Sequence, residues 1–135
     1  MVIGKTISLM NFNIQVIKTK RYCYINAISN TNERIGKLCI DLESEDSTRY
    51  KTNKPIGKII LVSTSQSACG NGVATALLNK AIELFNEYTL YLNVVPLPRT
   101  NENPKYTSKI GLMNFYSKFG FKRYNKDICV TTMIR

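Results

Sequence analysis

The sequence predicts an α/β fold in which a mostly antiparallel sheet is flanked by helices. Two observations support this prediction. The first half of the chain is rich in short β-favouring stretches, and an apolar stretch at 56–64 is followed by a helical pattern and then by another strand. A strand–helix–strand unit closes as a right-handed crossover whose two strands are parallel or nearly so. We therefore expect an antiparallel front half joined to one β-α-β unit.

The strands of the front half follow from their residue patterns. Residues 13–19 ("NIQVIKT") and 21–29 ("RYCYINAIS") are rich in β-favouring residues, and they form either one long strand or two. A polar turn at 30–34 leads into an alternating stretch at 35–43 ("IGKLCIDLE"). After a polar loop, residues 56–64 ("IGKIILVST") are almost continuously apolar, which is typical of a strand covered on both faces.

Two helices are expected in the second half. From Val73 the apolar residues recur at i, i+3, i+4 and i+7 as far as "NEYT", which indicates a helix with one buried face. The stretch 90–96 ("LYLNVVP") returns to a strand, and a polar loop with three prolines follows it. A second helix is expected from about Ser108, and Gly120 stands where a left-handed cap would end it.

The last part of the chain predicts a closing hairpin. Residues 121–124 ("FKRY") and 127–134 ("DICVTTMI") favour strands, and the dipeptide "NK" between them would form the turn. We find no linker in the sequence, so the whole of 1–135 is expected to be one domain.

Composition and charge narrow the classes of function. The formal net charge of +10 favours a polyanionic partner, either a nucleic acid or a phosphate-rich cofactor, although scattered basic residues also serve solubility. The chain has no histidine, which excludes Ser-His-Asp and Cys-His nucleophilic systems and His-based zinc sites. The four cysteines have no C-x-x-C spacing, so no metal site is expected.

The first residues and the apolar stretches of the chain indicate where in the cell it is expected. No apolar stretch is long enough to cross a membrane, and the first residues lack the apolar core of a signal peptide. We therefore expect a cytoplasmic protein.

A glycine-rich stretch, "SACGNGVATALL" at 67–78, begins the first helix directly after a buried strand. The first amides of a helix have no intrahelical partner, and the helix dipole adds partial positive charge there. Gly70 and Gly72 would let a phosphate approach the backbone without a Cβ in the way. A plain turn explains the two glycines equally well on its own.

Two segments together resemble the GNAT superfamily of N-acetyltransferases. The segment "LVSTSQSACGNGVATALLNKAIE" resembles that family's acetyl-CoA-binding signature, [Q/R]-x-x-G-x-[G/A], and "LMNFYSKFGF" at 112–121 resembles its second recurring segment. The resemblance covers roughly residues 35–135. It implies a mixed, mostly antiparallel sheet with a parallel splayed strand pair and flanking helices, and acetyl-CoA as cosubstrate. The N-terminal helical region of the family is reduced here, because residues 1–34 show no amphipathic helix.

The resemblance also implies roles for particular residues. Tyr116 takes the place of a tyrosine that protonates the departing CoA thiolate, and the backbone amide near Val62 would stabilise the oxyanion of the thioester carbonyl. Core packing is the alternative role for Tyr116. The residues expected to bind the cofactor are Leu61, Val62 and Ser63 along its pantetheine arm, Ser67, Ala68, Cys69, Gly70, Asn71, Gly72, Val73 and Ala74 at its pyrophosphate, and Lys109 at its phosphates.

The sequence departs from the family at two positions and leaves the base open. Ser67 replaces a longer Gln or Arg, and Lys109 stands where many relatives carry Asn. The strand at 56–64 holds no acidic residue to take the amine proton. Asp41 and Glu43 are the nearest candidates, although surface charge is their simpler role, and a water chain or a neutral amine are equal alternatives.

The leading interpretation is an acetyl-CoA-dependent N-acetyltransferase acting on a primary amine by direct attack. The alternatives are a binding module of the same fold for a protein or nucleic-acid partner, or an acetyltransferase of aminoacyl-tRNA, for which the basic surface would be useful. The sequence does not identify the acceptor. The short front half is compatible with a homodimer.

Overall fold

The computed structural model describes residues 11–65, 72–95, 108–124 and 131–135. Within these ranges the front half supplies β1 (Phe12–Lys18), β2 (Tyr22–Ser29), β3 (Arg34–Asp41), the short 3-10 helix η1 (Glu45–Arg49) and β4 (Ile56–Thr64). The second half supplies α2 (Val73–Leu84), β5 (Thr89–Asn93), α3 (Lys109–Ser117), β6 (Lys122–Tyr124) and β7 (Thr132–Ile134). The expected order of strands and helices is therefore confirmed, and the β-rich stretch at 13–29 forms two strands.

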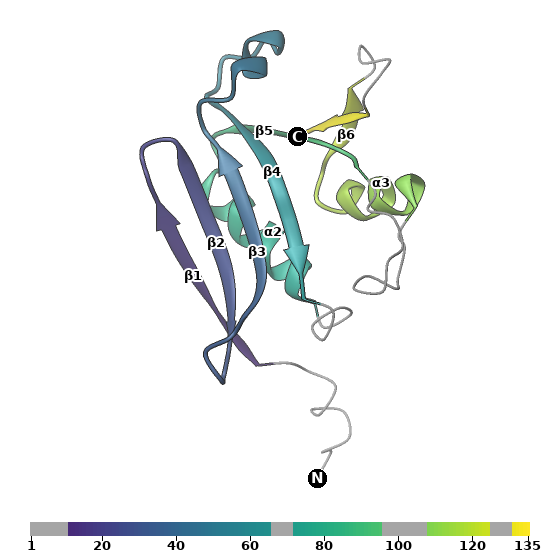
Figure 1. The fold of residues 1–135 in the computed structure, drawn as a ribbon. Coiled ribbons are helices and arrows are strands. Elements are labelled where there is room, and N and C mark those ends of the chain that lie inside the picture. Colours follow the sequence, from purple (N-terminus) through teal and green to yellow (C-terminus); the bar gives the residue numbers. More distant parts are fainter. Residues whose placement is uncertain (1–10, 66–71, 96–107, 125–130) are drawn as a thin grey trace.

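All strands join one seven-stranded sheet in the order β1-β2-β3-β4-β5-β7-β6. Every neighbouring pair is antiparallel except β4 and β5, which are parallel and are joined by the crossover helix α2. In Figure 1 the front hairpins lie to the left, α2 lies behind them, and β6 and α3 lie to the right of β4. The mixed sheet with one parallel pair is the fold class that the sequence predicted.

The core lies between the sheet and the apolar faces of the helices. Helix α2 packs against β2, β3 and β4 with its buried residues Val73, Leu77, Leu78 and Ala81, which repeat at helical spacing. The half-buried apolar residues of α3 pack against the same cluster. No helix within the described residues is long and apolar enough to span a membrane.

Helix α2 packs closely on the sheet over a glycine, Gly36. A Cβ added at Gly36 on β3 would lie 2.5 Å from Cγ1 of Val73 and 3.2 Å from Cδ1 of Leu77. The bare backbone of Gly36 therefore sets the distance between β3 and the first turn of α2. This matters for function because that turn lies beside the end of β4.

The closing hairpin differs from the prediction in its register. The strands β6 and β7 pair antiparallel, with Lys122 opposite Ile134 and Tyr124 opposite Thr132. This pairing leaves seven residues of the chain between Tyr124 and Thr132, so a two-residue turn does not join the paired strands; the expected turn residues Asn125 and Lys126 lie outside the described residues. The segment holds no glycine to mark a primed turn, so the alternation of its residues was compatible with several registers.

Candidate functional site

The two parallel strands separate part-way along their length. Strands β4 and β5 are paired only from Ile56 opposite Thr89 to Ile59 opposite Leu92. Beyond that point β5 continues beside β7, where the amide of Val94 donates to the carbonyl of Thr131 at 2.8 Å. The rest of β4 stays beside β3, so one edge of β4 faces a gap that no strand of the described residues fills. In Figure 1 this half of β4 runs away from β5.

A β-bulge lies where the strands separate. On β4, Ile59 is opposite Ile40 and Leu61 is opposite Cys39, so Ile60 is the extra residue. The bulge leaves the side chains of Ile60 and Leu61 exposed, at 47% and 41%. A bulge re-aims the strand, and here it coincides with the start of the gap.

The ladder between β3 and β4 determines which amides of β4 face this gap. The amide of Ser65 donates to the carbonyl of Ile35 at 2.8 Å. In an antiparallel ladder every second residue of a strand forms its main-chain hydrogen bonds with the same neighbouring strand. Counting back by twos from Ser65, the main-chain groups of Ser63 and Leu61 are therefore also directed toward β3. The main-chain N–H and C=O of Val62 are directed the other way, toward the gap. Of the three β4 residues expected to bind a cofactor, Val62 thus has the most suitable backbone.

The first turn of α2 lies directly after β4 in the chain. Gly72 is its N-cap, with φ +77°, a left-handed conformation that favours glycine. A Cβ there would meet nothing within 4 Å, so the glycine is required by backbone conformation and not by crowding. The N-cap makes no side-chain hydrogen bond and the first turn has no acidic residue, as expected of a helix end that accepts an anion.

The remaining glycine-loop predictions lie outside the described residues. These are Ser67, Ala68, Cys69, Gly70 and Asn71. Val73 is buried and Ala74 is half-buried at the start of α2. They follow Gly72 directly, so their amides belong to the same helix end.

Helix α3 carries the other predicted residues. Ser108 caps it by accepting from the amide of Gly111 at 3.0 Å, and Lys109 is exposed at its first position. Gly120 has φ +90°, which confirms the expected left-handed residue after the helix. In the view of Figure 1 α3 lies across the gap from the outer half of β4.

The side chain of Tyr116 is half-buried on α3. Its ring lies edge-on to Phe115 at 5.5 Å and to Phe121 at 6.1 Å between centroids. Burial raises the pKa of the Tyr116 hydroxyl above its ordinary value, so the phenol is protonated throughout the physiological range. It is therefore available as a proton donor. The aromatic packing that the sequence left as an alternative is present as well.

Asp41 is held in an ion pair. Its two oxygens accept from Nε and Nη2 of Arg21, both at 3.1 Å, and Oδ1 also accepts from the amide of Glu43 at 2.9 Å. The hydrogen bond from Arg21 is the main cause that lowers the pKa of Asp41. A carboxylate held ionised in this way is a poor proton acceptor, while Glu43 next to it is exposed. Neither residue gains support as a base.

The structure also shows a partly buried polar cluster that the sequence did not indicate. Asp46 accepts hydrogen bonds from Tyr91 Oη at 2.6 Å, from Lys58 Nζ at 2.8 Å and from Ser44. Burial alone would raise the pKa of Asp46, but these hydrogen bonds lower it well below its ordinary value. Burial raises the pKa of Tyr91 to about 12, with the bond to Asp46 adding to the effect. The signal available in the sequence was Lys58, a charged residue inside an apolar strand.

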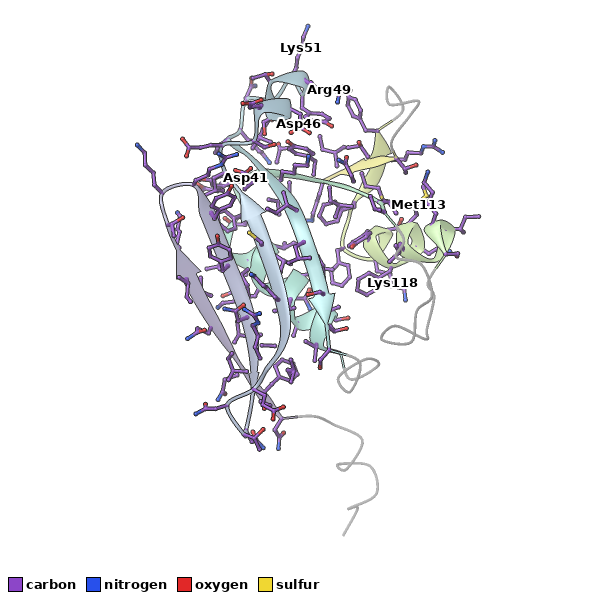
Figure 2. All side chains as sticks on the ribbon, in the orientation of Figure 1. Asp41, Asp46, Arg49, Lys51, Met113 and Lys118 are labelled. Carbon is purple, nitrogen blue, oxygen red and sulfur yellow. The ribbon has the colours of Figure 1, made fainter. Side chains whose placement is uncertain are left out.

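This cluster attaches η1 to the paired ends of β4 and β5. Asp46 lies in η1, Lys58 in β4 and Tyr91 in β5, and the ring of Tyr91 is 4.5 Å from that of Tyr50. In the view of Figure 2 Asp46 and Asp41 lie toward the top, away from Met113 of α3 and from Lys118, which follows that helix. The cluster therefore supports the paired half of the β4–β5 pair from which the gap opens.

Comparisons with known proteins were made at the level of sequence and of structure. No family model and no curated protein sequence matches the chain. Solved structures do match. A chain from Corynebacterium glutamicum, described as histone acetyltransferase HPA2 and related acetyltransferase, aligns with a TM-score of 0.58 at 20% identity and covers 85% of this chain. This chain spans 64% of the length of that one, less than two thirds.

Two Arabidopsis thaliana structures match similarly. Naa50 in complex with the bisubstrate analogue CoA-Ac-MVNAL aligns with a TM-score of 0.57 at 21% identity, covering 83% of this chain and 71% of that one. NAA60 in complex with acetyl-CoA aligns with a TM-score of 0.60 at 15% identity, covering 87% and 77%. The chain has the GNAT fold. The mostly antiparallel sheet, its one parallel pair β4–β5 and the two helices described above are thus parts of a GNAT fold, as the resemblance implied.

Proposed function

We propose that this chain is an acetyl-CoA-dependent N-acetyltransferase. The observation that carries the proposal is the gap between β4 and β5, into which the main chain of Val62 is directed. The N-terminus of α2, with Gly72 and no acidic residue, follows β4 directly. A strand edge of this kind can bond to the amides of a pantetheine arm as a further strand would. A helix end without acid residues favours a diphosphate.

The chemical roles follow from these positions. The Val62 amide would donate to the carbonyl oxygen of the thioester, where negative charge develops during attack. The Tyr116 hydroxyl would donate a proton to the departing thiolate sulfur. Leu61 and Ser63 would act through their side chains beside the arm, and Ala74, Val73 and the loop 67–71 would bind the diphosphate with their amides.

The reaction is a single displacement at the thioester. The acceptor nitrogen forms a bond to the carbonyl carbon, and the carbonyl π electrons move to the oxygen beside Val62. When the carbonyl re-forms, the carbon–sulfur bond breaks and the sulfur takes the proton of Tyr116. The nitrogen loses one proton to water, since Asp41 is held in its ion pair with Arg21. Solvent protonates Tyr116 again.

The solved structures add support at the level of the fold. NAA60 of Arabidopsis was solved with acetyl-CoA, and Naa50 with a bisubstrate analogue joining CoA to a peptide. The nature of the amine acceptor is a separate question.

Isothermal titration of the full chain with acetyl-CoA tests the proposal. We expect one site per chain with a dissociation constant in the micromolar range. Acetyl-pantetheine is the matched control, because it carries the same thioester without the diphosphate. We expect it to bind at least tenfold more weakly, since it lacks the group that the helix end accepts. Absence of acetyl-CoA binding by folded protein would contradict the proposal.

A further inference from the structure

The positive charge of the chain is distributed unevenly. Residues 96–135 contain eight Lys or Arg and only two Asp or Glu, whereas residues 1–95 contain eleven and seven. More than half of the net charge of +10 therefore comes from less than a third of the chain. An excess of one sign on one part of a surface creates a field that attracts the opposite charge.

Four of these residues surround the turn between α3 and β6. They are Lys118, Lys122, Arg123 and Arg135, which we name the basic edge, because β6 is the last strand of the sheet. All four are exposed. Arg21, Lys58 and Lys80 form ion pairs within the described part of the chain, and no residue of the basic edge does so there.

The turn holds one of the four in place. Arg135 Nε donates to the carbonyl of Phe119 at 2.6 Å. A Cβ at Gly120 would lie 3.2 Å from that nitrogen, so the glycine lets the guanidinium lie against the turn. This bond uses one of the five N–H groups of the guanidinium. An arginine ordered in this way loses less entropy when it binds a phosphate.

We propose that the basic edge binds the phosphate backbone of an RNA. The composition of the edge favours a nucleic acid over an acidic protein, because protein interfaces have an apolar core. The exposed large apolar side chains of the described residues lie elsewhere, at Val16, Ile17, Ile60, Leu61, Leu84, Val95 and Ile110. Binding by lysine and arginine without an apolar anchor is typical of contacts to a phosphate backbone.

The choice of RNA over DNA rests on the proposed function. Direct attack on a thioester needs an aliphatic amine, and the exocyclic amines of nucleobases are conjugated and poorly nucleophilic. An RNA aminoacylated at its 3′ end carries an aliphatic α-amino group, whereas DNA carries none. The inferred acceptor class is therefore an aminoacyl-RNA, held at the basic edge on the α3 side of the gap in the view of Figure 1.

The test compares two triple variants of the full chain with equal loss of charge. Lys118→Gln, Lys122→Gln and Arg123→Gln remove three charges from the basic edge. The control combines Lys20→Gln, Lys51→Gln and Lys54→Gln, which are also exposed; in the view of Figure 2 Lys51 lies at the top, apart from Lys118 on the right-hand side. Fluorescence anisotropy with a labelled, unacylated transfer RNA measures affinity between about 50 and 200 mM salt.

We expect the basic-edge variant to lose roughly tenfold in affinity and to reduce the slope of log K against log salt by about 2 to 3, one for each lost phosphate contact. The control variant should change affinity less than about twofold. Transfer of labelled acetyl groups to aminoacyl-tRNA should show a raised KM in the basic-edge variant with kcat retained.

Several outcomes would overturn the inference. An equal loss in both variants would show a response to net charge alone. Competition by polyglutamate or by a DNA hairpin as strong as by RNA would show an acidic-protein or DNA surface instead. Failure to bind RNA, with acetyl-CoA binding intact by calorimetry, overturns this inference and leaves the proposed function standing. RNA binding without acetyl-CoA binding contradicts the proposed function and the aminoacyl acceptor inferred from it, and leaves the basic edge as an RNA-binding surface.

Discussion

The residue that most directly joins fold to chemistry is Val62. Its amide faces the gap, while the amides of its neighbours on β4 face β3. We expect Val62→Pro to lower kcat by about a hundredfold or more, because proline has no N–H to stabilise the oxyanion. The variant should keep the sheet, since proline is tolerated where the N–H does not join the ladder.

The control for that prediction is the next residue. Ser63→Pro removes an amide directed toward β3, so it should lower the unfolding midpoint strongly. Urea unfolding followed by circular dichroism distinguishes the two variants. If Val62→Pro remains folded and as fast as the wild type, the Val62 amide has no part in the reaction.

Tyr116 offers a second test on the scale of a residue. Tyr116→Phe keeps the ring that packs against Phe115 and Phe121 but removes the proton donor. We expect kcat to fall by roughly a hundredfold and the dissociation constant of acetyl-CoA to stay within about twofold. Steady-state kinetics and calorimetry measure both. An unchanged kcat would leave Tyr116 with packing alone.

The sequence was sufficient to propose some of the residues of the site but not others. Val62 and Tyr116 could be proposed because each lies in a segment with a recognisable pattern. That Val62, and not Leu61 or Ser63, directs its amide outward depends on the bulge at Ile60 and on the register with β3. Asp46 could not be found, because its partners Lys58 and Tyr91 are distant in sequence and meet only through the fold.

On the scale of an element, Gly36 controls how closely α2 packs on β3. We expect Gly36→Ala to destabilise the fold by about 1–3 kcal/mol, because the new methyl group would overlap the stiff side chain of Val73. It should also weaken acetyl-CoA binding by moving the first turn of α2. Denaturant unfolding and calorimetry measure the two effects.

A double variant checks that cause. Val73→Ala removes the atom that the new methyl would strike, so Gly36→Ala should cost less in the Val73→Ala background than in the wild type. Equal costs in the two backgrounds would show that the lost stability has another origin.

The hydrogen bond that attaches η1 to the sheet should make the unfolding free energy depend on pH. Tyr91→Phe removes the hydrogen bond to Asp46 and should lower the unfolding free energy by roughly 1–2 kcal/mol at pH 7. The folded pKa of Tyr91 is about 12, above its ordinary value of 10. A group with a raised folded pKa contributes its full stability below the unfolded pKa and loses it as pH rises through the folded one. The difference between Tyr91→Phe and wild type should therefore shrink between about pH 10 and pH 12.

Denaturant unfolding at a series of pH values measures that difference. Comparing the two proteins removes the contribution of the other tyrosines and of the lysines, which titrate in both. A difference that stays constant across this range would show that the Tyr91 hydroxyl titrates normally in the folded chain.

Elements were predictable where their period was regular. Both helices followed from apolar residues at helical spacing, and the two ends of α3 followed from Ser108 and Gly120. The register of the closing hairpin did not follow, because pairing depends on β5 as well as on the two strands themselves. The helix η1 lies in a stretch that the sequence predicted as a loop, and tertiary contacts through Asp46 hold it.

On the scale of the whole molecule, binding of acetyl-CoA should raise the unfolding free energy. A ligand that binds only the folded chain raises the unfolding free energy by about 2.7 kcal/mol at a hundredfold excess over its dissociation constant. For a domain of this length we expect acetyl-CoA to raise the unfolding temperature by roughly 10 °C. Differential scanning fluorimetry measures the shift, and acetyl-pantetheine at the same concentration should give a much smaller one.

The overall topology was largely predictable from the sequence. The crossover from β4 through α2 to β5 fixed the parallel pair, and the strand-rich front half fixed the antiparallel neighbours. The divergence of β4 and β5 entered only through the resemblance to a family. It arises because β4 beyond Ile59 stays beside β3, while β5 pairs with β7 from Tyr91 to Asn93 and continues beside it to Val94, a long-range arrangement that no local pattern records.

The unpaired Ile60 divides β4 into two parts of opposite parity. Before it, odd-numbered side chains such as Ile59 are buried, and after it the even-numbered Val62 is the half-buried one while Leu61 and Ser63 are exposed. Removing that one residue would restore a continuous ladder and would leave Leu61, Val62 and Ser63 on their present faces, because Leu61 already lies opposite Cys39. A loss of one codon there would thus remove the local bend where the gap begins and keep the same side chains inside and outside, whereas a change of side chain at the same place would leave the bend intact.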